Sequence, residues 1–256
     1  MILCADIGNS SIDFCVYEDA KTRSLSFKIA TDHTKSRDEY AVIMESVFRL
    51  NGFDPRALTG AMIGSVAPDL TRTVSDAIQS LCGVQPLCVG PGIKTSLDIK
   101  TDHPAEVGAD LVANAVAALS LFPAPVIVAD LGTATTVLAI DAHKRLTDVY
   151  ILPGVYCSYA ALTKDAAAIP CVPLFPPKSL SGKNTASSVN VGVVYSAVYA
   201  LEGFISLLQD RLGDAPVVAT GGAADLIIPL CKHKISVHEH LTCDGLYQIY
   251  LKNRTN

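Results

Sequence analysis

The sequence of 256 residues has no run of lysine or arginine, and its basic residues are outnumbered by acidic ones. The 20 basic residues stand against 25 acidic residues, which gives a formal net charge of -5. Proteins that bind nucleic acid usually carry a basic stripe that neutralises the phosphodiester backbone. The sequence therefore predicts a protein without a nucleic acid partner.

A targeting or membrane-spanning segment is also missing from the start of the sequence. The first apolar stretch, residues 1–5, has no basic residues before it and is interrupted by Asp6. It is far shorter than the apolar part of a signal peptide or a membrane span. We therefore expect a cytoplasmic protein with no membrane partner.

Several well-known site motifs are absent as well. The 8 cysteines are dispersed without a Cys-x-x-Cys pair, and there is no His-Glu-x-x-His, so the motifs indicate no zinc site. We interpret the cysteines as reduced and mostly buried. The sequence contains no Gly-x-x-x-x-Gly-Lys-Ser/Thr and no protein-kinase glycine-rich loop with a matching His-Arg-Asp. These two solutions for phosphate binding are excluded.

What is present is apolar sequence arranged as strands that alternate with helices. Hydrophobic residues make up 50% of the chain and charged residues 18%, which is typical of a protein with a sizeable packed core. Alternating strands and helices predict an α/β fold with mixed or parallel sheets. The predicted strands are residues 1–5, 12–17, 25–30, 61–66, 86–89, 126–129, 217–220 and 234–237, and the predicted helices are residues 36–50, 68–81, 107–121, 158–168, 189–212 and 241–251.

The second half of the chain repeats the plan of the first. Each half begins with an apolar strand, an Asp-x-Gly turn and small hydroxyl residues, with the aspartates at Asp6 and Asp130. The two aspartates are 130 − 6 = 124 residues apart, close to half the chain. Self-similarity at that period indicates a duplicated domain. We therefore predict two lobes, residues 1–121 and 122–256, with a cleft between them.

The two Asp-x-Gly turns are candidate phosphate sites. Glycine allows a tight turn in which backbone N–H groups approach an anion, and the aspartate suits a hydrated magnesium ion. Neighbouring hydroxyl groups donate to phosphate oxygens. A single Asp-x-Gly is more often a simple hairpin turn, but two matched copies favour phosphate binding. The candidate residues are Asp6, Gly8, Asn9 and Ser10 in one copy and Asp130, Gly132, Thr133 and Thr135 in the other.

Two further segments carry candidate residues. Asp110 opens an apolar helix, where it either complements the helix N-terminus or accepts the proton of a substrate hydroxyl as a general base. Both interpretations remain open from the pattern alone. Gly221 and Gly222 follow an apolar strand and Thr220, where glycine lets the backbone approach an adenine or ribose, although a strand-to-helix turn uses glycine in any case.

Taken in order, these motifs resemble those of the type III pantothenate kinases, a family in the acetate and sugar kinase, Hsp70 and actin superfamily. The segments that carry the resemblance are residues 6–10, 104–110, 130–136, 152–162, 182–185 and 220–222. The resemblance implies a homodimer of chains with two ribonuclease-H-like lobes, the actin-like ATPase fold. It implies ATP-dependent phosphorylation of pantothenate to 4'-phosphopantothenate, the first step of coenzyme A synthesis. The implied cofactors are ATP, Mg²⁺ and a monovalent cation, K⁺ or NH₄⁺.

The resemblance also implies a role for individual residues. Asp6 would bind magnesium, Asp130 would serve the cation sites and Asp110 would be the general base. The implied substrate residues are Thr101, Gly108, Asp110, Leu111 and Thr185, the last reaching the substrate of the neighbouring protomer.

Several positions depart from the family pattern, among them Ser96 in place of a usual glycine and residues 149–151 in place of an expected Gly-Gly. Leu111 stands where the family usually has arginine, Thr101 where it often has tyrosine, and Asp13 where a basic or neutral residue is common. A leucine neither neutralises a substrate carboxylate nor donates hydrogen bonds to it. These departures keep two alternatives open: a weak or inactive homologue that binds nucleotide or regulates a partner, and a kinase of a different small alcohol.

Overall fold

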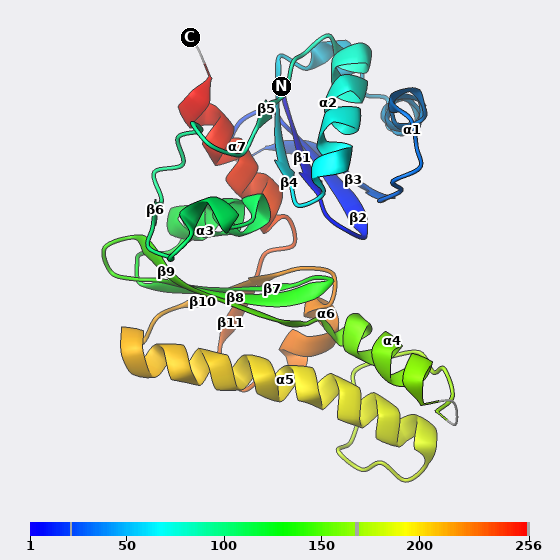
Figure 1. Cartoon of the computed structure of the whole chain (residues 1–256), viewed down its shortest axis with the longest axis vertical. Helices are drawn as coiled ribbons and strands as arrows, with labels where there is room; N and C mark the ends of the chain where they lie inside the picture. The colour runs from blue at the N-terminus through cyan, green and yellow to red at the C-terminus, as the bar shows by residue number, and fades with distance from the viewer. Residues whose placement is uncertain (21, 167–168, 255–256) are drawn as a thin grey trace. The chain divides into compact units, whose positions relative to one another are not determined.

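The computed structural model describes residues 1–20, 22–166 and 169–254, which form two compact units. The first unit contains Met1–Leu97, Asp102–Ala117 and His240–Asn256, and the second contains Asp98–Thr101 and Ala118–Glu239. Each unit is built around one β-sheet with helices packed on it (Figure 1).

The sheet of the first unit has the strand order β3-β2-β1-β4-β5. Strand β1 pairs antiparallel with β2 and parallel with β4. The strands are β1 (Ile2–Ile7), β2 (Ser11–Tyr17), β3 (Arg23–Ala30), β4 (Gly60–Ser65) and β5 (Leu87–Cys88). The helices are α1 (Arg37–Leu50), α2 (Pro68–Cys82), residues 109–117 of α3 (Ala109–Leu121), α7 (Leu241–Asn253), and the short 3-10 turns η1 (Pro55–Ala57) and η2 (Pro104–Glu106).

Strand periodicity decides which face of this sheet meets which helices. Leu3, Ala5 and Ile7 point to one face, where they form a core with α1 and α2. Helix α1 contributes its buried apolar row, and Ser36 and Glu39 close a capping box at its start. The opposite face, which Asp6 shares, is covered by α7.

The sheet of the second unit has the order β11-β10-β7-β8-β9-β6. Its strands are β6 (Asp98–Ile99), β7 (Val126–Leu131), β8 (Ala134–Ile140), β9 (Arg145–Pro153), β10 (Val217–Thr220) and β11 (Ile235–Val237). Its helical segments are α4 (Val155–Asp165), α5 (Thr185–Leu212), α6 (Ala224–Ile227) and the 3-10 turn η3 (Ile228–Leu230). The run β9-β8-β7-β10-β11 repeats β3-β2-β1-β4-β5 with the same parallel and antiparallel pairings. The predicted duplicated α/β fold is confirmed.

Helix α5 runs along the second sheet (Figure 1). Its buried residues pack with those of β7 and β8 in the core of this unit. Among the described residues it is the one helix long and apolar enough to cross a membrane by length and composition. Its packing against the sheet is equally typical of a core helix in a soluble protein.

Several element positions differ from the sequence-based expectation. Helix α5 begins at Thr185, before the predicted residue 189, because Asn184 and Ser187 form a capping box. Helix α4 ends at Asp165, whereas residue 168 of the predicted helix lies outside the described residues. The terminal helix α7 belongs to the first unit and not to the predicted second lobe, residues 122–256, because it packs on β1 and β4.

Candidate active site

The first Asp-x-Gly turn is a tight hairpin between β1 and β2. Gly8 N donates a hydrogen bond to Ser11 O at 3.0 Å, which closes the turn. Thr31, directly after β3, holds the turn, because its Oγ1 donates to Gly8 O at 2.7 Å and its N donates to Ser10 O at 3.1 Å. Asn9 and Ser10 are exposed at the tip. The turn is therefore a fixed element with polar residues facing solvent.

Asp6 lies opposite Asp13, its register partner on β2, so both carboxylates are on one face of the sheet. The charge of Asp13 is offset locally: Lys28 Nζ on β3 lies 3.0 Å from its Oδ1, and Ser11 Oγ donates to its Oδ2 at 3.3 Å. An unpaired Asp13 would repel phosphates, but Lys28 supplies a counter-charge.

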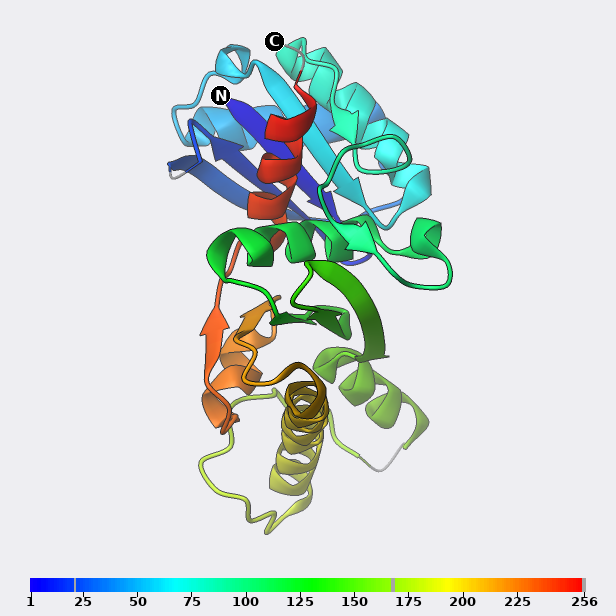
Figure 2. The ribbon, with the colours of Figure 1, turned by 90° about the vertical axis from the view of Figure 1, so that its left-hand side faces the viewer.

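Asp110 stands in the first turn of α3, and the loop before it lies beside the ends of β1 and β4. A Cβ atom built on Gly108 would be 3.6 Å from Val66 Cγ1. Val66 N in turn donates to Ile7 O at 3.0 Å. Figure 2 shows α3 next to the ends of these strands. The first unit thus brings the Asp6 turn and the start of the Asp110 helix to the same end of strands β1 and β4.

The carboxylate of Asp110 is in an unusual state for a surface helix N-terminus. Its Oδ1 is buried and has no hydrogen-bond partner among the described residues. Burial raises the pKa of Asp110, while backbone N–H groups of Leu111 and of Asp110 itself work in the opposite direction. A buried, unpaired carboxylate oxygen costs stability and is a stronger base than an exposed one. Oδ1 of Asp110 is thus open to a hydrogen bond from a donor outside the described residues.

The second Asp-x-Gly turn, at the end of β7, is in contact with the Thr220-Gly221-Gly222 turn. Gly221 has a φ of +97°, and a Cβ atom there would lie 2.5 Å from Leu131 N and 2.6 Å from Asp130 Oδ1. Ala223 N donates to Leu131 O at 3.0 Å. Glycine is therefore required at 221, both for its backbone conformation and for the close approach to Asp130.

The end of β9 also meets this second turn. Gly154 N donates to Thr133 O at 3.2 Å, so the start of α4 lies against Gly132 and Thr133. Thr135 and Thr136 follow on β8, each 8% exposed. Thr136 Oγ1 is buried without a partner among the described residues, as is Thr101 Oγ1 in the same unit. The second unit thus gathers residues of three predicted motifs around Asp130.

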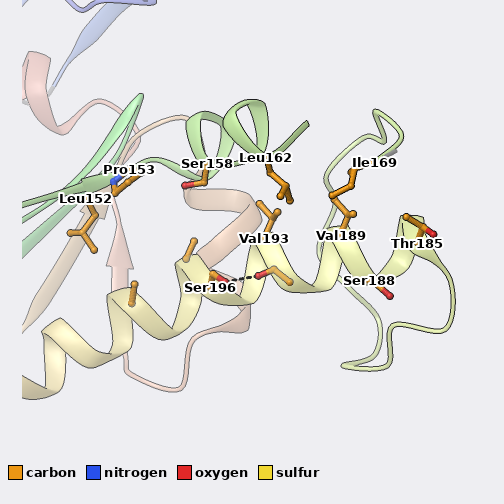
Figure 3. Close-up of a pocket in the computed structure, with 13 residues that line it drawn as sticks. Leu152, Pro153, Ser158, Leu162, Ile169, Thr185, Ser188, Val189, Val193 and Ser196 are labelled. Atoms are coloured by element: carbon orange, nitrogen blue, oxygen red, sulfur yellow. Dashed lines mark hydrogen bonds between the residues drawn. The ribbon is translucent and has the colours of Figure 1, made fainter. Parts of the chain in front are cut away.

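Thr185 lies elsewhere in the second unit, at the start of α5. It lines a largely apolar pocket of about 660 Å³ between α4 and α5 (Figure 3). The other labelled lining residues are Leu152, Pro153, Ser158, Leu162, Ile169, Ser188, Val189, Val193 and Ser196. The Asp130 turn is not part of this lining.

The predicted substrate residue Leu111 lies in the first unit, directly after Asp110 on α3, and its side chain is only 6% exposed.

No group of three or more histidine, cysteine or acidic side chains among the described residues is arranged to hold a metal ion by itself. Magnesium does not need such a cage, because it commonly binds through one or two carboxylates together with substrate phosphates and water. Asp6 and Asp130, each beside a phosphate-type turn, fit that mode of binding.

Sequence reasoning did not single out Lys28 or Thr31. Their roles depend on which residue of β3 faces which residue of β2 and the first turn, and strand register is not visible in the sequence of a single strand. The only available signals were a basic residue and a hydroxyl residue in or just after a predicted strand.

Comparisons with known proteins show which family the chain is similar to. A family model described as type III pantothenate kinase matches residues 2–207. The chain is 42% identical to a type III pantothenate kinase of Shouchella clausii over 256 residues, covering 99% of this chain and 100% of the relative. It is 40% identical to another from an Anaeromyxobacter species over 255 residues, with the same coverage of 99% and 100%.

Solved structures are similar to the chain in fold. An activator of 2-hydroxyisocaproyl-CoA dehydratase from Clostridium difficile, with bound ADPNP, has a TM-score of 0.55 at 13% identity, covering 100% of this chain and 98% of that one. A ROK family glucokinase from Streptomyces griseus, in complex with glucose and AMPPNP, has a TM-score of 0.51 at 13% identity, with 97% of each chain covered. At these identities the likeness concerns the fold alone.

Proposed function

The chain belongs to the type III pantothenate kinase family, and from that premise we propose how its own residues carry the reaction. The reaction of the family is the ATP-dependent phosphorylation of pantothenate in coenzyme A biosynthesis. The observation that carries the assignment of roles is Asp110, whose buried Oδ1 has no partner among the described residues.

Asp110 is the general base in this proposal. A substrate hydroxyl at its buried Oδ1 would supply the missing hydrogen bond. As the hydroxyl oxygen forms its bond to the γ-phosphorus of ATP, its proton passes to Asp110 and the bond from that phosphorus to ADP breaks. Burial, which raises the pKa of Asp110, makes the carboxylate better matched to this transfer near neutral pH.

Asp6 and Asp130 are the proposed cation residues, Asp6 for Mg²⁺ and Asp130 for the cation sites, including K⁺ or NH₄⁺. Support comes from their places beside the two turns and from the carboxylate oxygens that Mg²⁺ prefers. The cations would supply the positive charge that neutralises the phosphates. Their binding is separate from the proton transfer that we assign to Asp110.

Backbone and hydroxyl groups hold the nucleotide in this proposal. The phosphate-binding residues are Gly8, Asn9 and Ser10 of the first turn and Gly132, Thr133 and Thr135 of the second. Gly221 and Gly222 would face the adenosine. The assignment of Gly221 is supported by its close contact with the Asp130 turn, where only a glycine fits.

The substrate side is proposed to include Thr101, Gly108, Leu111 and Thr185, with Leu111 as the residue that limits affinity. Because Leu111 is only 6% exposed, thermal unfolding first checks that Leu111→Arg folds. In the folded variant we expect the KM for pantothenate to fall about 10- to 100-fold, because a hydrogen bond to a charged group contributes about 1.5 to 3 kcal/mol. Steady-state kinetics at fixed ATP would measure it, with Leu111→Met as the size-matched control. An unchanged KM in a folded arginine variant would show that the carboxylate is bound elsewhere.

We propose that the chain is a homodimer in the cytoplasm, joined along α5. Helix α5 exposes Tyr199 and Leu207, 57% and 56% exposed, and Tyr199 is the sequence neighbour of Ala200, which lines the same apolar pocket as Thr185. Sedimentation is expected to give twice the chain mass for the natural protein and the single chain mass for Tyr199→Asp combined with Leu207→Asp. A single chain mass for both proteins would contradict this interface.

One assay separates pantothenate phosphorylation from the two alternatives that Leu111 keeps open. The purified chain is incubated with ATP, Mg²⁺, K⁺ and either pantothenate or one of a set of other small alcohols, and ADP formation is followed. ADP formation that depends on pantothenate supports the proposal. Formation with another alcohol alone indicates a different substrate, and nucleotide binding without ADP formation indicates a regulatory homologue.

A further inference from the structure

Helix α7 makes a buried polar contact with the helix that carries Asp110. Asn114 follows Asp110 by four residues on α3, so the two side chains lie on the same side of that helix. Asn114 is 0% exposed, and its Oδ1 accepts a hydrogen bond of 2.8 Å from Thr242 Oγ1 of α7. Thr242 is itself 8% exposed. A buried hydrogen bond of this kind fixes the two helices relative to one another.

The same stretch of α7 also touches the backbone of α3. A Cβ atom on Gly245 would lie 2.5 Å from the carbonyl carbon of Ala113. Since no real side chain fits at that distance, the helices approach as closely as their backbones allow. The position of α3 is therefore defined by contact as well as by the hydrogen bond.

Helix α7 meets the strand that carries Asp6 at the neighbouring residues. A Cβ atom on Gly64 would lie 2.9 Å from Leu246 Cδ2, and Gly64 is the register partner of Asp6 on β4. Cys243 Sγ also donates to Asp13 O at 3.8 Å, and Asp13 is the register partner of Asp6 on β2. Within five residues, 242–246, α7 thus contacts α3 near Asp110 and the sheet at the level of Asp6.

We propose that Thr242 and Asn114 are positioning residues, through which α7 sets the placement of Asp110 relative to Asp6. The inference rests on the proposed function of these two aspartates. The Oδ1 atom of Asp110 has no protein partner among the described residues to hold it, so its position follows from that of α3. A displacement of about 1 Å in a reacting group lowers the rate by about 100-fold. Thr242 and Asn114 touch neither substrate nor reacting atoms in this proposal.

The test compares Thr242→Val, which removes the hydroxyl at nearly constant shape, with Thr242→Ser, which keeps it. We expect Thr242→Val to lower kcat about 10- to 100-fold while the KM for ATP changes less than about twofold, and Thr242→Ser to stay within about threefold of the natural kcat. A purely structural hydrogen bond would lower the melting temperature of the valine variant and leave kcat, measured well below that temperature, unchanged. That result would overturn the proposal.

A second readout on the same full-length proteins does not depend on activity. Hydrogen exchange of the amides of residues 110–114 is expected to be at least about tenfold faster in Thr242→Val and unchanged in Thr242→Ser, while α1 exchanges equally in all three proteins. Equal exchange of residues 110–114 in all three would refute the positioning role even if the natural chain did not phosphorylate pantothenate. If the natural chain were inactive and residues 110–114 still exchanged faster in Thr242→Val, the positioning role would stand and the proposed function would be wrong.

Discussion

Replacement of Asp110 by asparagine is expected to lower kcat for pantothenate phosphorylation about 10²- to 10⁴-fold, the range for loss of a general base. Asparagine has the same shape, and its side-chain oxygen still accepts a hydrogen bond, but it does not take up the proton. Because the substitution keeps the helix start intact, the KM for ATP is expected to change little. Steady-state kinetics of both proteins at saturating ATP and Mg²⁺ measure the effect.

The same substitution is expected to leave the folded protein at least as stable at neutral pH. Burial raises the pKa of Asp110 in the folded chain, so the folded state disfavours the ionised carboxylate. The free energy of unfolding therefore falls as the pH rises from the unfolded-state pKa of this group through its folded-state pKa. A neutral amide avoids that loss. Thermal unfolding at pH 7 checks this expectation. The matched control is Glu106→Gln in the exposed turn η2, which is expected to change kcat less than about twofold. Inactivity together with a lower melting temperature would contradict a catalytic role for Asp110.

Replacement of Asp6 by asparagine is expected to lower kcat/KM for ATP by about 100-fold or more and to raise the Mg²⁺ concentration needed for half-maximal rate. A carboxylate that holds the metal contributes several kcal/mol of charge stabilisation through it. Asparagine keeps one oxygen ligand but removes the negative charge. Rate measurements over a range of Mg²⁺ concentrations at fixed ATP give both quantities.

The structure offers a matched control for Asp6 on the adjacent strand. Asp13 is its register partner on the same face, but it is paired with Lys28. We expect Asp13→Asn to change kcat/KM and the Mg²⁺ requirement only a few-fold, since exposed ion pairs contribute about 0 to 1 kcal/mol. Equal losses in both variants would show that the metal is held by the pair of carboxylates and not by Asp6.

The repeated strand-turn-strand pattern was enough to predict the duplicated fold, but the lobe boundary depended on packing. Helix α7 follows the second sheet in sequence, yet it covers the first sheet. The physical reason is the small residues at Gly60 and Gly64 on β4, which leave room for Tyr250 and Leu246 of α7. The fit of large side chains on one element against glycines on another can be recognised only once it is known that the two elements pack together. Strand β6 was missed because its two residues, Asp98–Ile99, are too short to show an alternating pattern.

For the site, residue type and spacing selected the three aspartates, while contacts between distant segments remained hidden. Asp6, Asp110 and Asp130 each follow a local pattern, a strand end or a helix start. The hydrogen bond between Thr242 and Asn114 joins residues 128 positions apart, and neither residue lies in a recognisable motif. The contact of Gly221 with Asp130 likewise became apparent only from the parallel pairing of β10 with β7.

Transfer of the γ-phosphate of ATP to the hydroxyl of pantothenate by this chain is tested most directly by phosphorus NMR of the complete reaction. We expect a phosphomonoester signal of 4'-phosphopantothenate that grows as the γ-phosphate signal of ATP declines, and that is absent without pantothenate. Conversion of ATP to inorganic phosphate alone, or an unchanged spectrum from folded protein with bound nucleotide, would contradict it.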